Sequence, residues 1–180
     1  EKLFFMGITM QNHGGYTETY DNFPENYYKV GRSYTDANQY LSLVHESDEA
    51  VKNLISYFSK VDDPVEIIFF GDHQPSLNSN FYPILNGKGL TGLTEDELEK
   101  LYTVPFFIWT NYDTPEETVD ITSLDYLSTM ALERAGIELP AYNKFLADMQ
   151  EVVPAINSRG YYSKSAGGFL HIEEATGEEA

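Results

Sequence analysis

Apolar residues along this chain first stand out as three short continuous runs. The runs are Leu3–Met10, Val65–Gly71 and Val104–Thr110. Continuous apolar runs of this length, bounded by turn residues, are typical of strands buried on both faces in parallel sheets. We therefore expect three strands at these positions.

Helical spacing appears between the first two runs. Over Asp36–Lys60, apolar residues recur every three or four positions, at Leu41, Val44, Val51, Leu54, Ile55 and Phe58. This spacing predicts an amphipathic helix, with Thr35 or Asp36 as its N-terminal cap. Strand, helix and strand then form a βαβ unit with a right-handed crossover.

The second half of the chain carries further helix and hairpin signals. Thr94 and Glu97 have the spacing of a capping box, which predicts the start of a short helix. Further helices are expected over Ser123–Ala135 and Ala141–Ile156, and a small hairpin is expected within residues 160–172. The stretches Gln11–Thr35 and Asp72–Gly92 read as long loops, which in compact domains are often functional.

These elements predict an α/β fold with a mostly parallel sheet flanked by helices, and a small C-terminal irregular or hairpin segment. We expect residues 1–157 to belong to one catalytic-type domain and residues 158–180 to form a tail. The chain enters an apolar run directly after Glu1 and Lys2, without an initiator Met. We therefore expect a longer protein, whose preceding part holds membrane anchors and further site residues.

Composition supports a folded core and narrows the function. Apolar residues make up 42% of the 180 positions, including 14 Tyr and 11 Phe. Eleven basic against 29 acidic residues give a net charge of −18. This charge argues against nucleic acid as a partner, because its binding requires Lys and Arg to neutralise phosphates. With no cysteine in the chain, disulfides, thiolate metal sites and cysteine nucleophiles are excluded.

Candidate chemistry gathers where the first two predicted strands end. Asp72 and His73 directly follow the second strand, and His13 follows the first, next to Gly14 and Gly15. Ligands of parallel sheets bind outside the carboxyl ends of the strands. Carboxylate and imidazole groups hold Zn²⁺ or Mn²⁺, so Asp72 and His73 are candidate metal ligands.

Ordinary turn chemistry is the alternative at each of these positions. Asp72 could cap a turn beside a surface His73, and His13 could be a loop histidine without a ligand. No nucleophile stands out, because the chain has neither a Gly-x-Ser-x-Gly elbow nor a phosphate-binding loop. Thr9 and Thr17 are nearby hydroxyls that nothing in the spacing selects.

Taken together, these segments resemble the C-terminal half of the sulfatase-type domain of lipoteichoic acid synthases and related phosphoglycerol transferases. The resemblance rests on residues 8–16 (ITMQNHGGY), 70–75 (FGDHQP) and 104–109 (VPFFIW), with a helix bearing Asp48 between the first two. Residues 123–140 also fit the late helices of that family. The Gly-Asp-His element is shared by the wider alkaline phosphatase and sulfatase superfamily, whereas Gln-Asn-His-Gly-Gly is more particular to the lipoteichoic acid synthase-like group.

The resemblance implies roles for the matching residues. Asp72 and His73 would bind a catalytic divalent metal, with Mn²⁺ expected and Mg²⁺, Zn²⁺ or Ca²⁺ as alternatives. His13 would contact the phosphate or glycerol of the substrate. In the family, a metal-bound threonine attacks the phosphorus of phosphatidylglycerol, but this threonine has no counterpart in the chain. We therefore expect the isolated chain to bind metal weakly and to lack transferase activity.

Several functions stay open within this picture. The substrate is expected to be an anionic phospholipid, but a sulfate ester or a phosphoethanolamine lipid suits the same metal framework. A non-catalytic module that binds a glycan or cell-wall polymer, or a vestigial metal site, are further alternatives. For the enzyme we expect a location on the extracellular face of a bacterial membrane, and for the isolated fragment self-association.

Overall fold

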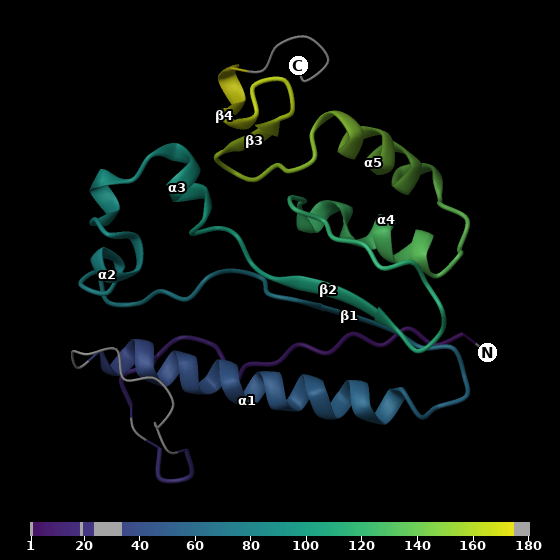
Figure 1. Cartoon of the computed structure of the whole chain (residues 1–180), viewed down its shortest axis with the longest axis horizontal. Coiled ribbons are helices and arrows are strands. Elements are labelled where there is room, and N and C mark those ends of the chain that lie inside the picture. The colour runs from purple at the N-terminus through teal and green to yellow at the C-terminus, as the bar shows by residue number, and fades with distance from the viewer. Residues whose placement is uncertain (1, 19, 24–33, 175–180) are drawn as a thin grey trace. The chain divides into compact units, whose positions relative to one another are not determined.

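The computed structural model describes residues 2–18, 20–23 and 34–174 of the chain. It has a mixed α/β structure (Figure 1), which confirms the predicted class. Its elements, in chain order, are α1 (Thr35–Phe58), β1 (Glu66–Phe70), α2 (Tyr82–Asn86), η1 (Leu90–Gly92), α3 (Glu95–Glu99), β2 (Phe106–Thr110), α4 (Leu124–Arg134), α5 (Ala141–Val152), β3 (Gly160–Ser163), β4 (Gly168–His171) and η2 (Ile172–Glu174). None of the helices in the described ranges combines the length and apolar character that a membrane crossing needs.

The chain divides into two compact units. Unit 1 consists of Glu1–Val61 and His73–Leu93, and unit 2 consists of Asp62–Asp72 and Thr94–Ala180. Unit 1 therefore holds α1, α2 and η1, and unit 2 holds the strands and the remaining helices. The predicted division after residue 157 stays a prediction.

Helix α1 forms where the apolar spacing predicted it, but its N-terminal cap differs. The residue at the cap position is Tyr34, and no side chain caps the helix. The predicted caps were wrong because Thr35 and Asp36 already lie inside the first turn. Asp36 instead accepts hydrogen bonds from the backbone N–H of Ala37 at 2.9 Å and of Asn78 at 2.5 Å. Its carboxylate thus joins the loop after residue 73 to the start of α1, where negative charge is favourable.

Leu3–Met10 does not form the predicted strand. Its backbone has no regular structure, and Leu3 is 91% exposed. A strand needs a neighbouring strand to satisfy its N–H and C=O groups, and within the described residues none pairs with this segment. The prediction was therefore wrong, although the apolar pattern that suggested it is present.

Strands β1 and β2 form a two-stranded sheet, and their pairing is antiparallel. Ile68 lies opposite Ile108, and Phe69 lies opposite Phe107 with the two rings stacked at 5.3 Å. The predicted strands at 65–71 and 104–110 are confirmed, but the parallel arrangement is not found among the described strands. These two apolar runs identified strand residues correctly, but an apolar run carries no information on the direction in which its strand pairs.

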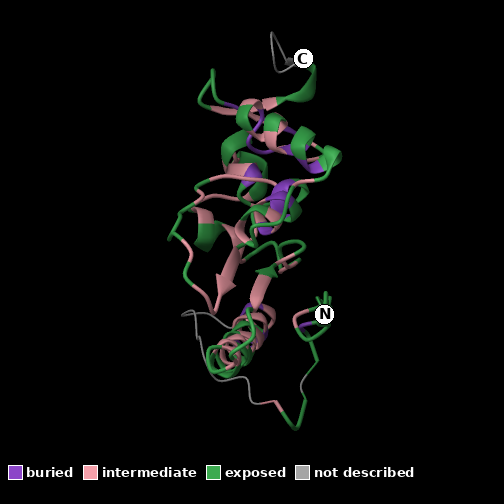
Figure 2. Cartoon of the chain, turned by 90° about the vertical axis from the view of Figure 1, so that its right-hand side faces the viewer, coloured by how far each residue is buried: buried purple, intermediate pink, exposed green. Residues whose placement is uncertain are grey.

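The buried residues of unit 2 lie mainly in α4, in α5 with the residues that follow it, and in β3. The buried residues there include Tyr126 and Leu127 of α4, Leu146 of α5 and Tyr161 of β3. Figure 2 colours the buried parts of the chain purple. The capping box at Thr94 and the antiparallel β3–β4 hairpin are both present, as the sequence predicted.

Candidate functional site

The turn that carries His13 is held against α1 in unit 1. Ser47 of α1 donates a hydrogen bond to the side-chain oxygen of Asn12 at 3.0 Å. The Tyr16 hydroxyl donates a hydrogen bond to the backbone carbonyl of Asn12 at 2.6 Å. The rings of Tyr16 and Tyr40 pack edge to face, with their centroids 5.5 Å apart. Burial, with a smaller contribution from Tyr40, raises the pKa of Tyr16, so this phenol stays protonated and donates at neutral pH. The backbone around Asn12 is thereby fixed on the helix.

His13 itself lies at the surface of this turn. Its backbone N–H donates to the Met10 carbonyl at 3.1 Å, which closes the turn. The imidazole is exposed. Gly15 has a φ of 107°, a conformation that disfavours other residues, and neither Gly14 nor Gly15 has an atom within 4 Å of the place where a Cβ would stand. The turn is therefore open beside His13, which suits a substrate contact; that role stays a prediction.

Asp72 and His73 follow β1 directly after Gly71, as the sequence indicated. Both side chains are exposed. The Nδ1 atom of His73 lies 2.9 Å from the backbone carbonyl of Gln74. If Nδ1 carries the hydrogen, it donates to that carbonyl and Nε2 becomes the acceptor nitrogen, an arrangement common in metal-binding histidines.

The donor chemistry of this pair suits a divalent metal, but the described residues do not complete a site. No group of three or more His, Cys, Asp or Glu side chains placed to hold a metal occurs within the described ranges. Two ligands are fewer than the three protein ligands typical of a catalytic zinc-type site. Asp72 belongs to unit 2, whereas His73 and His13 belong to unit 1. The ligand roles of Asp72 and His73 therefore stay predictions.

The two unselected hydroxyls, on Thr9 and Thr17, are both exposed. His171, at the end of β4, is also exposed, and its Nδ1 accepts a hydrogen bond from the backbone N–H of Glu173 at 3.4 Å. Residues 24–33 of the long loop lie outside the described residues.

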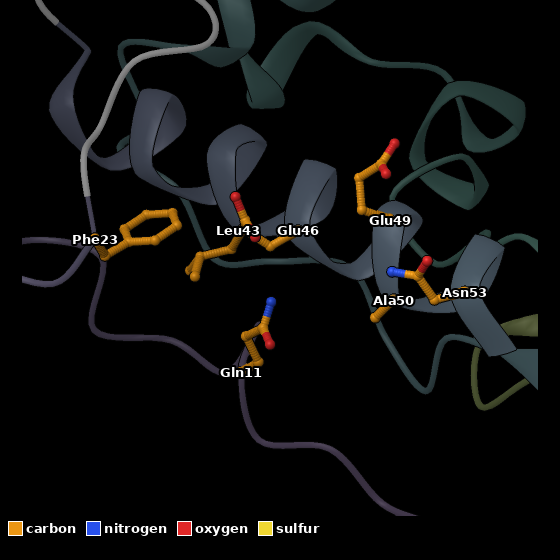
Figure 3. Close-up of a pocket in the computed structure, with 7 residues that line it drawn as sticks. All are labelled: Gln11, Phe23, Leu43, Glu46, Glu49, Ala50 and Asn53. Carbon is orange, nitrogen blue, oxygen red and sulfur yellow. The ribbon is translucent and has the colours of Figure 1, made fainter.

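An open groove in unit 1 was not predicted from the sequence. It has a volume of about 380 Å³ and lies between α1 and the segment that precedes it (Figure 3). Its lining residues are Gln11, Phe23, Leu43, Glu46, Glu49, Ala50 and Asn53. The α1 residues among them fall mostly at spacings of three and four, which places them on one helix face. This spacing was visible in the sequence, but the residues that complete the groove are brought to the helix by the fold.

Comparison with known proteins gives two relatives from Rhizobium meliloti. A protein described as a candidate cyclic beta-1,2-glucan modification protein is 28% identical over 159 residues, covering 84% of this chain. A capsular polysaccharide biosynthesis protein, RkpI, is 37% identical over 79 residues, covering 44% of this chain. This chain spans 25% and 13% of the lengths of these two relatives.

A solved structure has a similar fold. The phosphoglycerol transferase GacH of Streptococcus pyogenes, in complex with sn-glycerol-1-phosphate, superposes with a TM-score of 0.62 at 19% sequence identity. The match covers 84% of this chain and 37% of GacH. The family model named Sulfatase matches residues 1–137, which is more than half of the 180 positions. The chain belongs to the sulfatase family.

Proposed function

We propose that this chain is part of a metal-dependent phosphoglycerol transferase of the lipoteichoic acid synthase-like group. The observation that carries the proposal is the sulfatase family match together with a fold similar to that of a phosphoglycerol transferase. Two sequence elements support the narrower group. They are Gln11–Gly15, held on α1 with His13 exposed, and the Gly-Asp-His element that follows β1.

Asp72 and His73 would hold the divalent metal in this enzyme, with Mn²⁺ as the expected ion. When bound, such a metal polarises phosphoryl oxygens and stabilises charge on them. His13 would bind the phosphate or the glycerol of the substrate. The threonine nucleophile and the remaining ligands would come from a part of a longer protein that lies outside this segment. The segment spans 25% of the length of the relative described for cyclic beta-1,2-glucan modification.

The proposed donor is an anionic phospholipid that carries a phosphoglycerol headgroup, met at the extracellular face of a bacterial membrane. The chain has a net charge of −18, so a bound metal is needed to offset repulsion of an anionic headgroup. The names of the relatives, one for cyclic beta-1,2-glucan and one for capsular polysaccharide, support a glycan as the acceptor.

Sulfate-ester hydrolysis is the second candidate, because the family is named for it. The two activities use similar tetrahedral anions, but they release different products. Phosphoglycerol transfer releases diacylglycerol from phosphatidylglycerol, whereas a sulfatase releases sulfate from an aryl sulfate. Transfer of phosphoethanolamine would require the ethanolamine lipid and would leave phosphatidylglycerol intact.

The test compares the 180-residue chain with the native polypeptide that contains it. Asp72→Ala and His73→Ala are made in both, with His171→Ala as a matched control, because His171 is an exposed histidine outside residues 1–137. In the native polypeptide we expect either ligand variant to weaken Mn²⁺ binding at least about tenfold and to abolish diacylglycerol release. The control should change neither measurement.

The 180-residue chain should bind Mn²⁺ weakly and turn over neither substrate. Unchanged metal content in both ligand variants would refute the metal assignment. Sulfate release without diacylglycerol release would favour the sulfatase instead.

A further inference from the structure

The groove in unit 1 has a defined framework. One face of α1 lines the groove with Leu43, Glu46, Ala50 and Asn53 (Figure 3). Gln11 extends towards that face from the preceding segment. Phe23 lies farther along the same segment, near the end of the groove that Leu43 lines. The groove is therefore a helix face with a loop laid beside it.

Hydrogen bonds fix this loop on the helix. Ser47 donates to Asn12 at 3.0 Å, directly beside Gln11 in the chain. Gln39, which is 2% exposed, donates to the backbone carbonyl of Glu18 at 3.0 Å. The groove is thus bounded by contacts between residues far apart in the sequence, and its lining is positioned before any ligand arrives.

The charge of the lining disfavours an anionic ligand. Two of its seven residues are carboxylates, Glu46 and Glu49, and none is basic. Lys52 pairs with Glu49 at 3.0 Å, but it does not line the groove. A phosphate or sulfate group would be repelled here, both by these carboxylates and by the net charge of −18. The phospholipid donor therefore does not fit this groove.

The lining also disfavours a metal ion. No group of three or more His, Cys, Asp or Glu side chains suited to a metal is found in the part of the chain that the structure describes. Divalent cations such as Ca²⁺ take six or more oxygen ligands. Two carboxylates on successive turns of one helix do not supply such a set.

A hydroxyl-rich ligand suits every group in the lining. Carboxylates accept hydrogen bonds from hydroxyls strongly, and the amides of Gln11 and Asn53 both donate and accept. Phe23, Leu43 and Ala50 offer apolar surface to the C–H face of a sugar ring. The volume of about 380 Å³ lies within the range of small-molecule sites, roughly 300–1,000 Å³.

We propose that this groove binds an uncharged saccharide. Resting on the proposed function, we assign this saccharide as the glycan acceptor of the phosphoglycerol group. Gln11 is two residues from His13 in the same closed turn, so a saccharide in the groove contacts the turn that carries the proposed phosphate- or glycerol-binding residue. The acceptor would then contact Gln11 and the donor would contact His13, the two residues that flank Asn12 in the sequence.

The test measures binding of neutral β-1,2-linked gluco-oligosaccharides to the 180-residue chain by titration calorimetry and ligand-observed NMR. Glu46→Gln keeps the side-chain shape and removes the charge, and we expect about tenfold weaker binding. Ala50→Leu fills the groove with a good helix former and should abolish binding. Asp48→Asn is the matched control, because it removes one charge from the same helix at a residue that does not line the groove.

Three results would overturn the proposal. The first is that no neutral oligosaccharide binds. The second is that the variants Glu46→Gln, Ala50→Leu and Asp48→Asn all bind the oligosaccharide equally well. The third is that sn-glycerol-1-phosphate or Mn²⁺ competes with the oligosaccharide for the groove. The circular dichroism spectrum of each variant checks that α1 is retained.

A transfer assay with the native polypeptide separates this proposal from the proposed function. If the oligosaccharide binds in the groove but receives no phosphoglycerol, the saccharide site stands and its role as acceptor fails. If phosphoglycerol is transferred to another acceptor while no saccharide binds in the groove, the proposed enzyme function stands and the groove proposal fails.

Discussion

Tyr126 is the most buried of the described tyrosines. Its side chain has no exposed surface, and the hydroxyl donates to the backbone carbonyl of Val153 at 2.7 Å. Burial, with a smaller effect of Asp125, raises the pKa of Tyr126, so the donor is retained at neutral pH. Tyr126→Phe should leave the Val153 carbonyl buried without a donor. We expect a loss of about 1–3 kcal/mol in the free energy of unfolding.

Urea denaturation followed by tryptophan fluorescence measures this loss. The single tryptophan, Trp109, lies in β2 and therefore reports on unit 2. Tyr142→Phe is the matched control, because Tyr142 is 68% exposed on α5 and should lose almost nothing. Equal stability of both variants would contradict a structural role for the Tyr126 hydroxyl.

The chemistry of single residues was readable from the sequence, whereas their assembly was not. Asp72 and His73 were selected because carboxylate and imidazole groups bind metals and follow a strand, and the structure does place them directly after β1. The groove escaped prediction because Gln11 and Phe23 meet α1 only after folding. Side-chain chemistry is a property of the residue, but a cavity is a property of segments brought together from distant positions.

At the scale of elements, a buried carboxylate joins α3 to the chain that enters the β3–β4 hairpin. The Glu99 side chain is 5% exposed, and its Oε1 lies 3.3 Å from Nε of Arg159. The side-chain amide of Asn157 donates to the other Glu99 oxygen. Arg159 also pairs with Glu95 at 2.7 Å, so α3 presents two carboxylates to one guanidinium. This cluster fixes the hairpin against α3.

Glu99→Ala should loosen this junction. Asn157 would lose the acceptor of a partly buried amide, and Arg159 would lose one of its two carboxylates. We expect a loss of about 1–3 kcal/mol in the free energy of unfolding, again measured by urea denaturation with Trp109 fluorescence. Glu138→Ala is the control, because Glu138 is 90% exposed in its pair with Lys144 and should cost less than about 1 kcal/mol. If both variants lost the same small amount, the Glu99 cluster would not hold the hairpin.

Most helices, which have local signals, were predicted well, whereas the pairing of strands, which depends on distant partners, was not. The spacing of apolar residues defined α1, and Thr94 with Glu97 defined the start of α3. Leu3–Met10 failed as a strand because strand formation needs a neighbour, and the direction of the β1–β2 pairing depends on how the connecting chain returns. Helix and cap signals lie within a few residues, whereas sheet topology is a long-range property.

At the scale of the whole molecule, strong negative charge and exposed apolar surface act in opposite directions. Four apolar side chains near the N-terminus are each more than three-quarters exposed: Leu3, Phe4, Phe5 and Ile8. Contiguous exposed apolar surface of this kind marks an interaction site or favours association. The net charge of −18 keeps copies of the chain apart, and salt weakens that repulsion.

We therefore predict that the 180-residue chain self-associates through Leu3–Met10, more strongly as salt concentration rises. Sedimentation velocity over a range of protein and salt concentrations measures the average mass. Two variants, Phe5→Lys and Ile8→Lys, should shift the chain towards the monomer. Each of them replaces an exposed apolar side chain. Thr9→Lys adds the same charge to the same segment without removing a large apolar side chain, so it separates the effect of apolar surface from that of charge. A chain that stays monomeric at high protein and salt concentration would refute the prediction, and equal effects of Thr9→Lys and Ile8→Lys would attribute association to charge alone.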